Sequence, residues 1–388
     1  MSHLIQAAGT VLLILIFTAM ETSSQSLNVD EAWNRVEDHF NQKMNENDVV
    51  GGALLFMDEN GAKKSSLNGY ADLQKGKEVD ENTIFHWASI TKTLTAIAIM
   101  QLRDRDKLSL DDSLTDYLPE LFKIHNPYGS LDELTIRMAL NHSTGLRNPT
   151  WPWGGSEDWH PFEPTEWSQL VAMFPYTKVE FEPGSRHSYS NPAIIFLGKI
   201  IEKLSGDSWE SFVHKNILNP LEMHRSYFNH TPEHLLSNRV NSYVIKNGRP
   251  EPRGLDFHTG ITTSNGGLNA PLADMTKYLN FLLGRPEMDH PVLERSSLEE
   301  LWEIELPIGE SEGVKSSVGL SFFVEEFNGT QVIGHTGTQW SNYSWFYIHP
   351  ESGTAVISVT NTDGLYDMHR FRHEMSRYVF EHLFTLYK

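Results

Sequence analysis

The chain has 388 residues, of which 39% are hydrophobic and 21% charged, a composition typical of a folded globular protein. Its 51 acidic and 31 basic side chains give a formal net charge of −20, which argues against a nucleic-acid partner because phosphate backbones are bound by clusters of Lys and Arg. The sequence contains no cysteine, which excludes disulfides, thiolate metal sites and cysteine nucleophiles.

The amino-terminal end carries a short uncharged apolar run, VLLILIFTAM at residues 11–20, followed by small and polar residues. A run of this length is too short to cross a bilayer comfortably and is typical of a secretory signal. We therefore expect a signal peptide at residues 1–24 and an exported protein, periplasmic or secreted, with no membrane span after cleavage. A retained membrane anchor is the alternative, because only His3 and the chain's own amine supply positive charge before the run.

Residues 25–388 show no repeat or linker, so we expect a single domain. Residues 51–58 have the apolar character of a strand, Asn60-Gly61 is a hairpin signal, and residues 65–73 are the expected partner strand. Residues 93–102 (TLTAIAIMQL) carry no charge and are apolar on most faces. This pattern predicts a helix that is buried on all sides.

Helical patterns dominate the middle of the chain, and strand patterns return near its end. Helices are predicted at 135–141, 166–173, 191–204, 209–218 and 366–385, and strands at 318–323, 330–334, 343–348 and 355–359. Strands at both ends with helices between them predict an α+β fold. One antiparallel sheet is built from the N- and C-terminal segments and flanked by helices, and a mainly helical lobe at about 90–255 is inserted into it. A cleft between the sheet and the lobe is the expected place for a site.

Ser89-Ile90-Thr91-Lys92 stands at the start of the predicted buried helix. Residues three apart share one helical face, so the hydroxyl of Ser89 and the amine of Lys92 can meet. Lys92 can remove the serine proton if burial lowers its pKa enough to keep the amine neutral. The start of the helix would also direct backbone N–H donors at an oxyanion. Taken alone, the pattern is better explained by a capping serine and a solvated lysine.

A turn-rich segment at residues 183–192 (PGSRHSYSNP) leads into the next predicted helix. Such segments place side chains in clefts. Here Tyr189 offers a phenol that can relay protons, and Asn191 offers an amide that can orient a carbonyl. The same Tyr-x-Asn spacing occurs at 227–229 and 278–280, where a surface turn or helix packing explains it.

The third element is His335-Thr336-Gly337, next to a predicted strand. Glycine at this point lets another chain or a substrate approach the strand backbone closely. The same triplet occurs at 258–260, in a loop rich in Gly and Thr. We favour His335 because its copy of the triplet lies at a strand edge.

Together, the three elements resemble those of the serine beta-lactamase and penicillin-binding protein superfamily, which are Ser-x-x-Lys, Ser/Tyr-x-Asn and Lys/His-Thr-Gly. The Tyr-Ser-Asn form is most similar to the branch of class C beta-lactamases and D-alanyl-D-alanine carboxypeptidases. The resemblance runs from about Val49 to Asp363. It includes FHWA at 85–88, LTIRMALNHSTGL at 134–146, NPLEM at 219–223 and GGL at 266–268.

The resemblance implies a role for each matching residue. Ser89 would be the acylated nucleophile, Lys92 its proton partner, and Tyr189 the group that shuttles protons to the leaving group. Which of Lys92 and Tyr189 takes the first proton is open. No metal and no organic cofactor is implied.

The resemblance also implies how the substrate is held. Asn191 would hold its amide or carbonyl, and the opposite wall would be lined by the strand residues His335, Thr336 and Gly337. The backbone N–H groups of Ser89 and Thr338 would form the oxyanion hole.

Two positions depart from dedicated class C beta-lactamases, which usually carry Tyr-Ala-Asn and Lys-Thr-Gly where this chain has Ser190 and His335. A histidine, with an ordinary pKa of about 6.5, is only partly charged at neutral pH and is a weaker partner for a carboxylate than lysine. This shifts the expected substrate from beta-lactams toward peptides, amides or esters. If His335 grips a carboxylate, affinity should weaken as pH rises through its titration.

Residues 148–167 hold four of the ten tryptophans of the chain. The segment is expected to be either a lid, with Trp153 shaping the substrate pocket, or a loop that Trp and Pro side chains pin to the helical lobe.

The sequence as a whole predicts an exported serine hydrolase that forms an acyl-enzyme on Ser89. Its substrate is expected to be a small molecule or peptide, cleaved at an amide, D-amino-acid peptide, beta-lactam or ester bond. The alternatives are a carboxylesterase of the same fold and a penicillin-binding or sensor protein that acylates without turnover.

Overall fold

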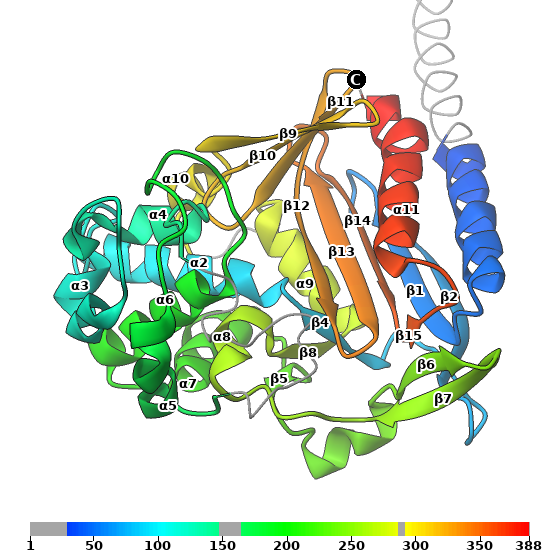
Figure 1. Ribbon diagram of the computed structural model, residues 1–388. Helices are drawn as coiled ribbons and strands as arrows, with labels where there is room; N and C mark the ends of the chain where they lie inside the picture. Colours follow the sequence, from blue (N-terminus) through cyan, green and yellow to red (C-terminus); the bar gives the residue numbers. More distant parts are fainter. Residues whose placement is uncertain (1–28, 147–163, 286–291, 388) are drawn as a thin grey trace, which may run out of the picture.

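A nine-stranded antiparallel sheet forms the scaffold of the protein, with strands from both ends of the chain (Figure 1). The computed structural model describes residues 29–146, 164–285 and 292–387. The strand order is β3-β2-β1-β14-β13-β12-β11-β10-β9. The strands are β1 (Gly51–Met57), β2 (Lys63–Asp72), β3 (Lys77–Glu78), β9 (Leu306–Ser311), β10 (Val314–Val318), β11 (Phe323–Phe327), β12 (Thr330–Gln339), β13 (Asn342–His349) and β14 (Thr354–Thr360). The predicted α+β fold, with a sheet built from both termini, is confirmed.

The two ends of the chain meet where β1 pairs with β14. Gly52 lies opposite Thr360, and Met57 lies opposite Ala355. On its other side β1 pairs antiparallel with β2, which confirms the hairpin predicted at Asn60-Gly61. The amino-terminal strands are therefore part of the same sheet as the strands that end the chain.

One predicted strand, at residues 318–323, is wrong. Residues 319–322 form the connection between β10 and β11. The backbone N–H of Leu320 donates to the carbonyl of Leu301, which lies outside the sheet. Its apolar side chain is buried although the residue is not part of a strand. Residues 319–322 therefore have the apolar pattern of a strand but do not pair with a neighbouring strand.

Helices cover both faces of the sheet. The helix of residues 29–46 and α11 (Met368–His382) lie side by side in Figure 1 and share a hydrophobic cluster with the strands. The other face packs on α9 (Leu272–Leu282) and the helical lobe. Alternate side chains of β1 point to the two faces, so Phe56 belongs to the first cluster and Leu55 to the second. This is why β1 is buried at every position.

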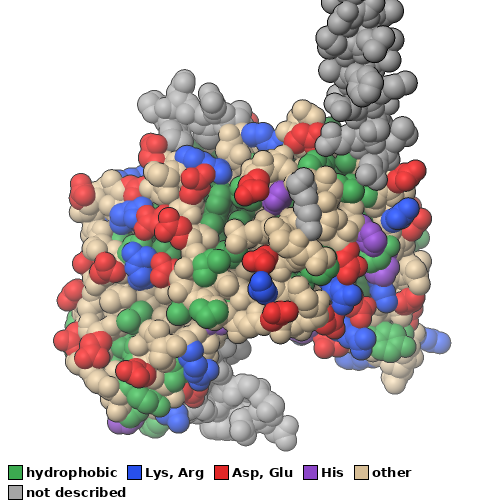
Figure 2. All heavy atoms as spheres, turned by 90° about the horizontal axis from the view of Figure 1, so that it is seen from above, with side chains coloured by type: hydrophobic (Ala, Val, Ile, Leu, Met, Phe, Trp, Pro, Cys, Tyr) green, Lys and Arg blue, Asp and Glu red, His purple; other side chains and the backbone are tan. Residues whose placement is uncertain are grey.

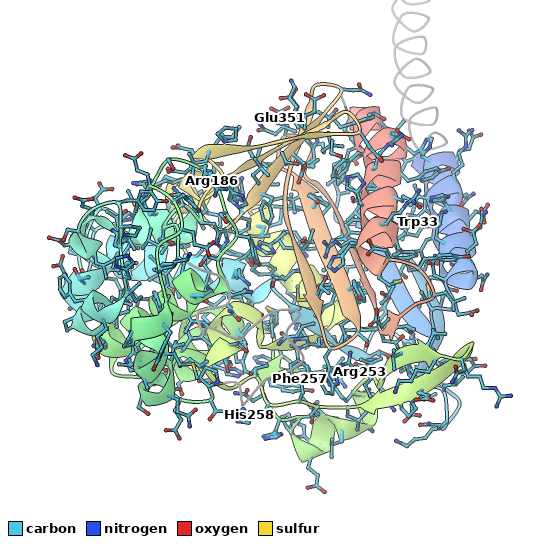
Figure 3. The ribbon with its side chains drawn as sticks, viewed as in Figure 1. Trp33, Arg186, Arg253, Phe257, His258 and Glu351 are labelled. Atoms are coloured by element: carbon cyan, nitrogen blue, oxygen red, sulfur yellow. The ribbon has the colours of Figure 1, made fainter. Side chains whose placement is uncertain are left out.

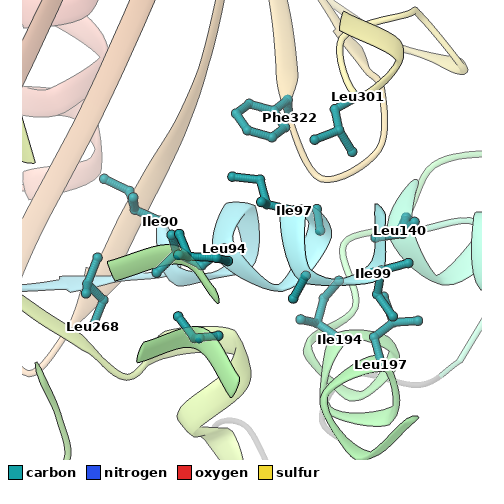
Figure 4. Close-up of a cluster of buried hydrophobic side chains, with 14 of the residues drawn as sticks. Ile90, Leu94, Ile97, Ile99, Leu140, Ile194, Leu197, Leu268, Leu301 and Phe322 are labelled. Carbon is teal, nitrogen blue, oxygen red and sulfur yellow. The ribbon is translucent and has the colours of Figure 1, made fainter. Parts of the chain in front are cut away.

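The lobe is built around α2 (Thr91–Asp104), which is buried continuously from Thr91 to Leu102. This confirms the helix predicted to be buried on all sides. Figure 4 shows the apolar side chains of α2 between two groups of neighbours. One group comes from other helices of the lobe, such as Ile194 and Leu197, and the other includes Phe322, in the connection between β10 and β11. The other helices are α3 (Leu114–Tyr117), α4 (Ile136–Leu140), α5 (Trp167–Met173), α6 (Asn191–Ser205), α7 (Trp209–Val213), α8 (Thr263–Gly266) and α10 (Arg295–Glu300).

Two small sheets join the lobe to the scaffold. One has the order β4-β8-β5, with β4 (Ile84–Ala88), β8 (Leu268–Pro271) and β5 (Tyr227–Phe228). The other has the order β15-β6-β7, with β15 (Thr362–Asp363), β6 (Ser242–Lys246) and β7 (Arg249–Gly254). The segment expected to be a mainly helical lobe, residues 90–255, therefore also contains a β-hairpin.

Charged side chains are spread over the surface. Figure 2 shows Asp and Glu side chains distributed over the face seen from above, with Lys and Arg side chains between them. Within the part of the chain that the structure describes, none of the helices has the length and apolar character needed to cross a membrane. The expected signal peptide, residues 1–24, lies outside this part.

Candidate active site

Ser89 lies in the turn between β4 and α2, where it is half-buried. The residue before it, Ala88, has a φ of +50°, in the left-handed region that side chains with a Cβ rarely adopt. The hydroxyl of Thr91 stabilises the turn, since it donates to the carbonyl of Ala88 at 2.6 Å and accepts from the backbone N–H of Leu268 at 2.9 Å. The turn thus presents Ser89 at the end of a buried helix.

Lys92 is the second residue of α2, three residues after Ser89, and is fully buried. Its Nζ lies 3.0 Å from Ser89 Oγ and donates to the backbone carbonyl of Asn265 at 2.8 Å. Burial holds the pKa of the Lys92 amine well below its ordinary value. A neutral amine with one N–H engaged by Asn265 has a lone pair free to accept the proton of Ser89.

Tyr189 brings a phenol to the same point. Its side chain is hydrogen-bonded to that of Ser89, and Lys92 Nζ lies 4.9 Å from the centre of its ring. Burial raises the pKa of Tyr189 above its ordinary value, so the phenol keeps its proton at neutral pH. Hydroxyl, amine and phenol are therefore in mutual contact.

The residues after Tyr189 start α6. The hydroxyl of Ser190 accepts from the backbone N–H of Ala193 at 3.3 Å and caps the helix, and Pro192 stands in its first turn. The Ser190 hydroxyl therefore caps α6, which an alanine side chain could not do. Asn191 is the first residue of α6, and its backbone carbonyl accepts from the side-chain amide of Asn265 at 3.4 Å.

The strand β12 carries His335, Thr336, Gly337 and Thr338 along the other side of the site. A Cβ on Gly337 would lie 2.3 Å from the carbonyl oxygen of Trp87. Only glycine lets β12 come this close to the turn that holds Ser89. A close backbone approach was expected at this glycine from another chain or a substrate, and the segment that makes it here is the protein's own turn at Trp87.

His335 differs from the partly charged group expected at this wall. Its side chain is 1% exposed, and its ring centre lies 6.4 Å from that of Tyr189. Its Nδ1 donates to the carbonyl of Thr336 at 2.6 Å. Burial, followed by the positive charge of Lys92, lowers the pKa of His335 to about 3, so the ring is neutral at physiological pH. A grip on a carboxylate that weakens through a histidine titration near neutral pH is therefore not expected.

The cation beside β12 is Arg372 of α11, which the sequence did not single out. Its Nη1 donates to Thr338 Oγ1 at 3.0 Å and to the carbonyl of Gly337 at 3.4 Å. Arg372 stands in an ordinary amphipathic helix, so no local pattern marks it. Asn265 was also missed, because its contribution to Lys92 is made by a backbone carbonyl.

The competing copies of the motifs lie elsewhere. His258 is exposed, and its Nδ1 accepts from the backbone N–H of Gly260 at 2.9 Å. Figure 3 shows it close to Phe257, in the segment that follows β7. Tyr278 is buried in α9 and donates to Thr93 Oγ1 at 2.6 Å. Trp153, expected in a lid, lies outside the described residues.

Residues 36–377 match the model of the family described as Beta-lactamase, which confirms the resemblance seen in the sequence. Protein flp of Staphylococcus aureus (strain MW2) is 23% identical over 320 residues, which cover 82% of this chain and 61% of that protein. Esterase EstB of Burkholderia gladioli is 28% identical over 245 residues, which cover 60% of each chain. The chain thus spans about three fifths of the length of these relatives.

Solved structures show the same fold. An octameric penicillin-binding protein homologue from Pyrococcus abyssi is 26% identical, with a TM-score of 0.73 over 85% of this chain and 73% of that chain. A class C beta-lactamase is 20% identical, with a TM-score of 0.73 over 92% of this chain and 97% of that chain. The second likeness is one of fold alone.

Proposed function

The chain belongs to the Beta-lactamase family, and we propose that it is an exported serine hydrolase that forms an acyl-enzyme on Ser89. The bond cleaved is an amide, D-amino-acid peptide, beta-lactam or ester bond. The observation that carries the proposal is the distance of 3.0 Å between Lys92 Nζ and Ser89 Oγ, beside the Tyr189 phenol.

In the first step, Lys92 acts as the general base. Ser89 Oγ attacks the substrate carbonyl carbon, and its proton passes to the neutral Lys92 amine. The carbonyl oxygen becomes an oxyanion, which accepts hydrogen bonds from the backbone N–H groups of Ser89 and Thr338. Lys92 is favoured over Tyr189 for this step because burial lowers the pKa of the amine, which favours its neutral form, and raises the pKa of the phenol, which favours its protonated form.

In the second step, the tetrahedral intermediate collapses and the bond to the leaving group breaks. The Tyr189 phenol gives its proton to the leaving nitrogen or oxygen and recovers one from the Lys92 ammonium. A water molecule then attacks the acyl carbon and gives a proton to the neutral Lys92 amine. The bond between that carbon and Ser89 Oγ breaks, Oγ takes a proton back from Lys92, and the acid is released. These steps use an alcohol, an amine and a phenol, and they require no metal or organic cofactor.

The substrate is held between the lobe and β12. In this proposal Asn191, at the start of α6, would hold the amide or carbonyl of the substrate, and the opposite wall would be lined by His335, Thr336 and Gly337 of β12. Arg372 adds a cation beside Thr338. This arrangement suits a peptide or amide that carries a carboxylate.

A carboxylesterase is the second candidate. The neutral state of His335 favours an uncharged substrate at that wall. A relative named Esterase EstB is 28% identical to this chain. An uncharged ester does not need a group that binds a carboxylate.

The proposal is tested with three substrates: a chromogenic cephalosporin, a short-chain nitrophenyl ester and a D-alanyl-D-alanine peptide. We expect the wild type to turn over at least one of them, Ser89→Ala to be slower by about 10³-fold or more, and mass spectrometry to locate an acyl adduct on Ser89. Ser208→Ala, at the exposed start of α7, is the matched serine control and should keep full activity.

Two results would contradict the proposal. A stoichiometric burst without turnover would indicate a penicillin-binding or sensor protein. Equal rates in the wild type and Ser89→Ala would exclude Ser89 as the nucleophile.

A further inference from the structure

His142 packs directly against Tyr189. It follows α4 in a tight turn, with a φ of +59°, and its side chain is 0% exposed. The centres of the two rings are 4.5 Å apart, and their planes are tilted by 37°. The imidazole is therefore one of the surfaces that fix the position of the phenol.

His142 also holds the backbone on both sides of Tyr189. Its carbonyl oxygen accepts from the backbone N–H of Ser188 at 2.8 Å. Its ring Nδ1 lies 3.3 Å from the backbone nitrogen of Ser190 and accepts from that N–H. One residue thus ties down the residues before and after Tyr189, and Ser190 is in turn fixed as the cap of α6.

The hydrogen bond from Ser190 also fixes the tautomer of His142. Because Nδ1 accepts, the neutral ring carries its proton on Nε2. Burial, followed by the positive charge of Lys92, holds the pKa of His142 well below its ordinary value. Nε2 is buried without a hydrogen-bond partner among the described residues, so Nδ1 makes the polar contact of this ring.

We propose that His142 is a positioning residue for Tyr189, which keeps the phenol in hydrogen-bonding contact with Ser89. This inference rests on the proposed function of Tyr189 as the proton donor to the leaving group. His142 acts by holding the backbone and supporting the ring, and it does not touch the reacting atoms. Its loss should therefore slow the proton-transfer steps more than it weakens substrate binding.

The conservative replacement is His142→Asn. The side-chain oxygen of Asn takes nearly the place of Nδ1 and can accept from Ser190, and Asn tolerates a positive φ better than other residues. His142→Gln carries its amide one atom further out, near the place of Nε2, and loses this acceptor. Both variants carry an amide, but only His142→Asn can accept the hydrogen bond from Ser190. A difference between them therefore reports on this hydrogen bond.

The test measures kcat and KM for hydrolysis of a D-alanyl-D-alanine peptide or an alkyl ester, because the leaving amine or alkoxide of these substrates must take up a proton. We expect His142→Ala and His142→Gln to lower kcat by about 10-fold or more, with KM within about threefold of wild type, because a positioned acid contributes about 10²-fold or more. His142→Asn should keep kcat within about threefold. In a Tyr189→Phe background, His142→Ala should add less than about a twofold loss, because the group that it positions is already gone.

His349→Ala is the matched control for loss of a buried imidazole. The Nδ1 of His349 lies 2.7 Å from Ser352 Oγ. His349 is the last residue of β13, at the opposite end of the strand from Tyr343, which pairs with Thr338. We expect it to lower the thermal midpoint without changing kcat. Comparison of the Asn and Gln variants keeps the inference testable if His142→Ala does not fold.

Two results would overturn the inference. One is a His142→Gln variant with the kcat of wild type. The other is a loss from His142→Ala that appears in full in the Tyr189→Phe background. Failure of the proposed function itself is distinguishable, because it would appear as activity retained in Ser89→Ala.

Discussion

Gly337 lies against the carbonyl oxygen of Trp87, two residues before Ser89. The same carbonyl accepts a hydrogen bond from Ser344 Oγ at 3.0 Å, on the strand next to β12. The sheet and the turn that carries Ser89 are therefore joined by direct backbone approach. The distance between the two walls of the site depends on the absence of a side chain at position 337.

Gly337→Ala should push β12 away from this turn. The added Cβ would stand 2.3 Å from the carbonyl oxygen of Trp87 and 2.5 Å from Ser344 Oγ. We expect a loss of about 1 to 3 kcal/mol in the free energy of unfolding, typical of overpacking, and a fall in kcat/KM of about 10²-fold or more. Urea denaturation and ester hydrolysis measure the two effects.

Gly76→Ala is the control for Gly337→Ala. Gly76 has a φ of +63° and nothing within 4 Å of an added Cβ, so its replacement costs only backbone strain, about 1 to 2 kcal/mol. It should keep full activity. Gly337→Ala with wild-type activity would show that the close approach is not needed.

The rate of acylation should rise with pH and become flat above the pKa of Lys92. Only the neutral amine accepts the proton of Ser89, and the neutral fraction grows as pH rises through that pKa. Because burial lowers the pKa, the plateau should begin well below the ordinary lysine value of 10.5. Stopped-flow acylation by a nitrophenyl ester, from about pH 5 to about pH 10, measures the profile. A rate still climbing at the upper limit would argue against a neutral Lys92.

Lys92→Arg should remove the general base that accepts the proton of Ser89. A guanidinium stays protonated at all accessible pH values and cannot take the proton. We expect acylation to be slower by about 10³-fold or more. Lys199→Arg, which replaces a lysine that forms a surface ion pair with Glu202, is the matched control and should leave the rate unchanged. Normal acylation in Lys92→Arg would shift the role of base to Tyr189.

The protein should lose stability in mild acid because buried histidines, among them His86, His142 and His335, are neutral in the folded state. Burial lowers the pKa of His86 to about 4 and that of His335 to about 3, from an ordinary value of 6.5. As pH falls below about 6.5, the unfolded chain binds protons that the folded chain does not. The free energy of unfolding should thus fall by a few kcal/mol between about pH 6.5 and about pH 4.

His335→Gln tests this acid sensitivity, because it removes one of the buried histidines. The free energy of unfolding, measured with urea at several pH values, should decline less steeply in the variant than in wild type. If the free energy of unfolding declines with the same slope in both proteins, His335 takes up its proton in the folded state as readily as in the unfolded state.

Ser190→Ala should lower stability by about 1 kcal/mol, because it removes the cap of α6. Activity should stay within about threefold of wild type, since the hydroxyl is turned to the helix. Ser208→Ala removes the equivalent cap of α7, where Ser208 Oγ accepts from the backbone N–H of Ser211 at 3.2 Å, and should lower stability by a similar amount. A much larger loss of activity at Ser190 would give its hydroxyl a role in the reaction.

Arg372→Ala should weaken the binding of substrates that carry a carboxylate. For such a peptide we expect KM to rise by about 10-fold, whereas KM for a neutral nitrophenyl ester should stay within about twofold. Because arginine stays charged, KM of the wild type for the peptide should be flat between about pH 5 and about pH 8. An equal rise in KM for both substrates would instead indicate that Arg372 supports the strand.

The sequence predicted what depends on local pattern. The buried helix α2 follows from periodicity, and the sheet shared by the two chain ends follows from strand patterns at both ends with helices between them. Ser89, Lys92 and Tyr189 were singled out by short motifs that resemble those of a known family. Arg372 and His142 could not be found in this way, because their contacts exist only after distant segments pack together. The hairpin of β6 and β7 was missed because Pro250 and Pro252 argue against a strand, and they are tolerated because β7 is an edge.

The pairing of β1 with β14 also constrains how the molecule is made. About three hundred residues separate Gly52 from its partner Thr360, so the loop closed by this pairing contains the entire lobe. During synthesis, β1 and β2 leave the ribosome long before β14 exists, and one edge of β1 remains unsatisfied until then. The pairing of β1 with β14 consequently cannot form before β14 has been synthesised, and a chain that ends before Thr354 lacks this strand of the sheet.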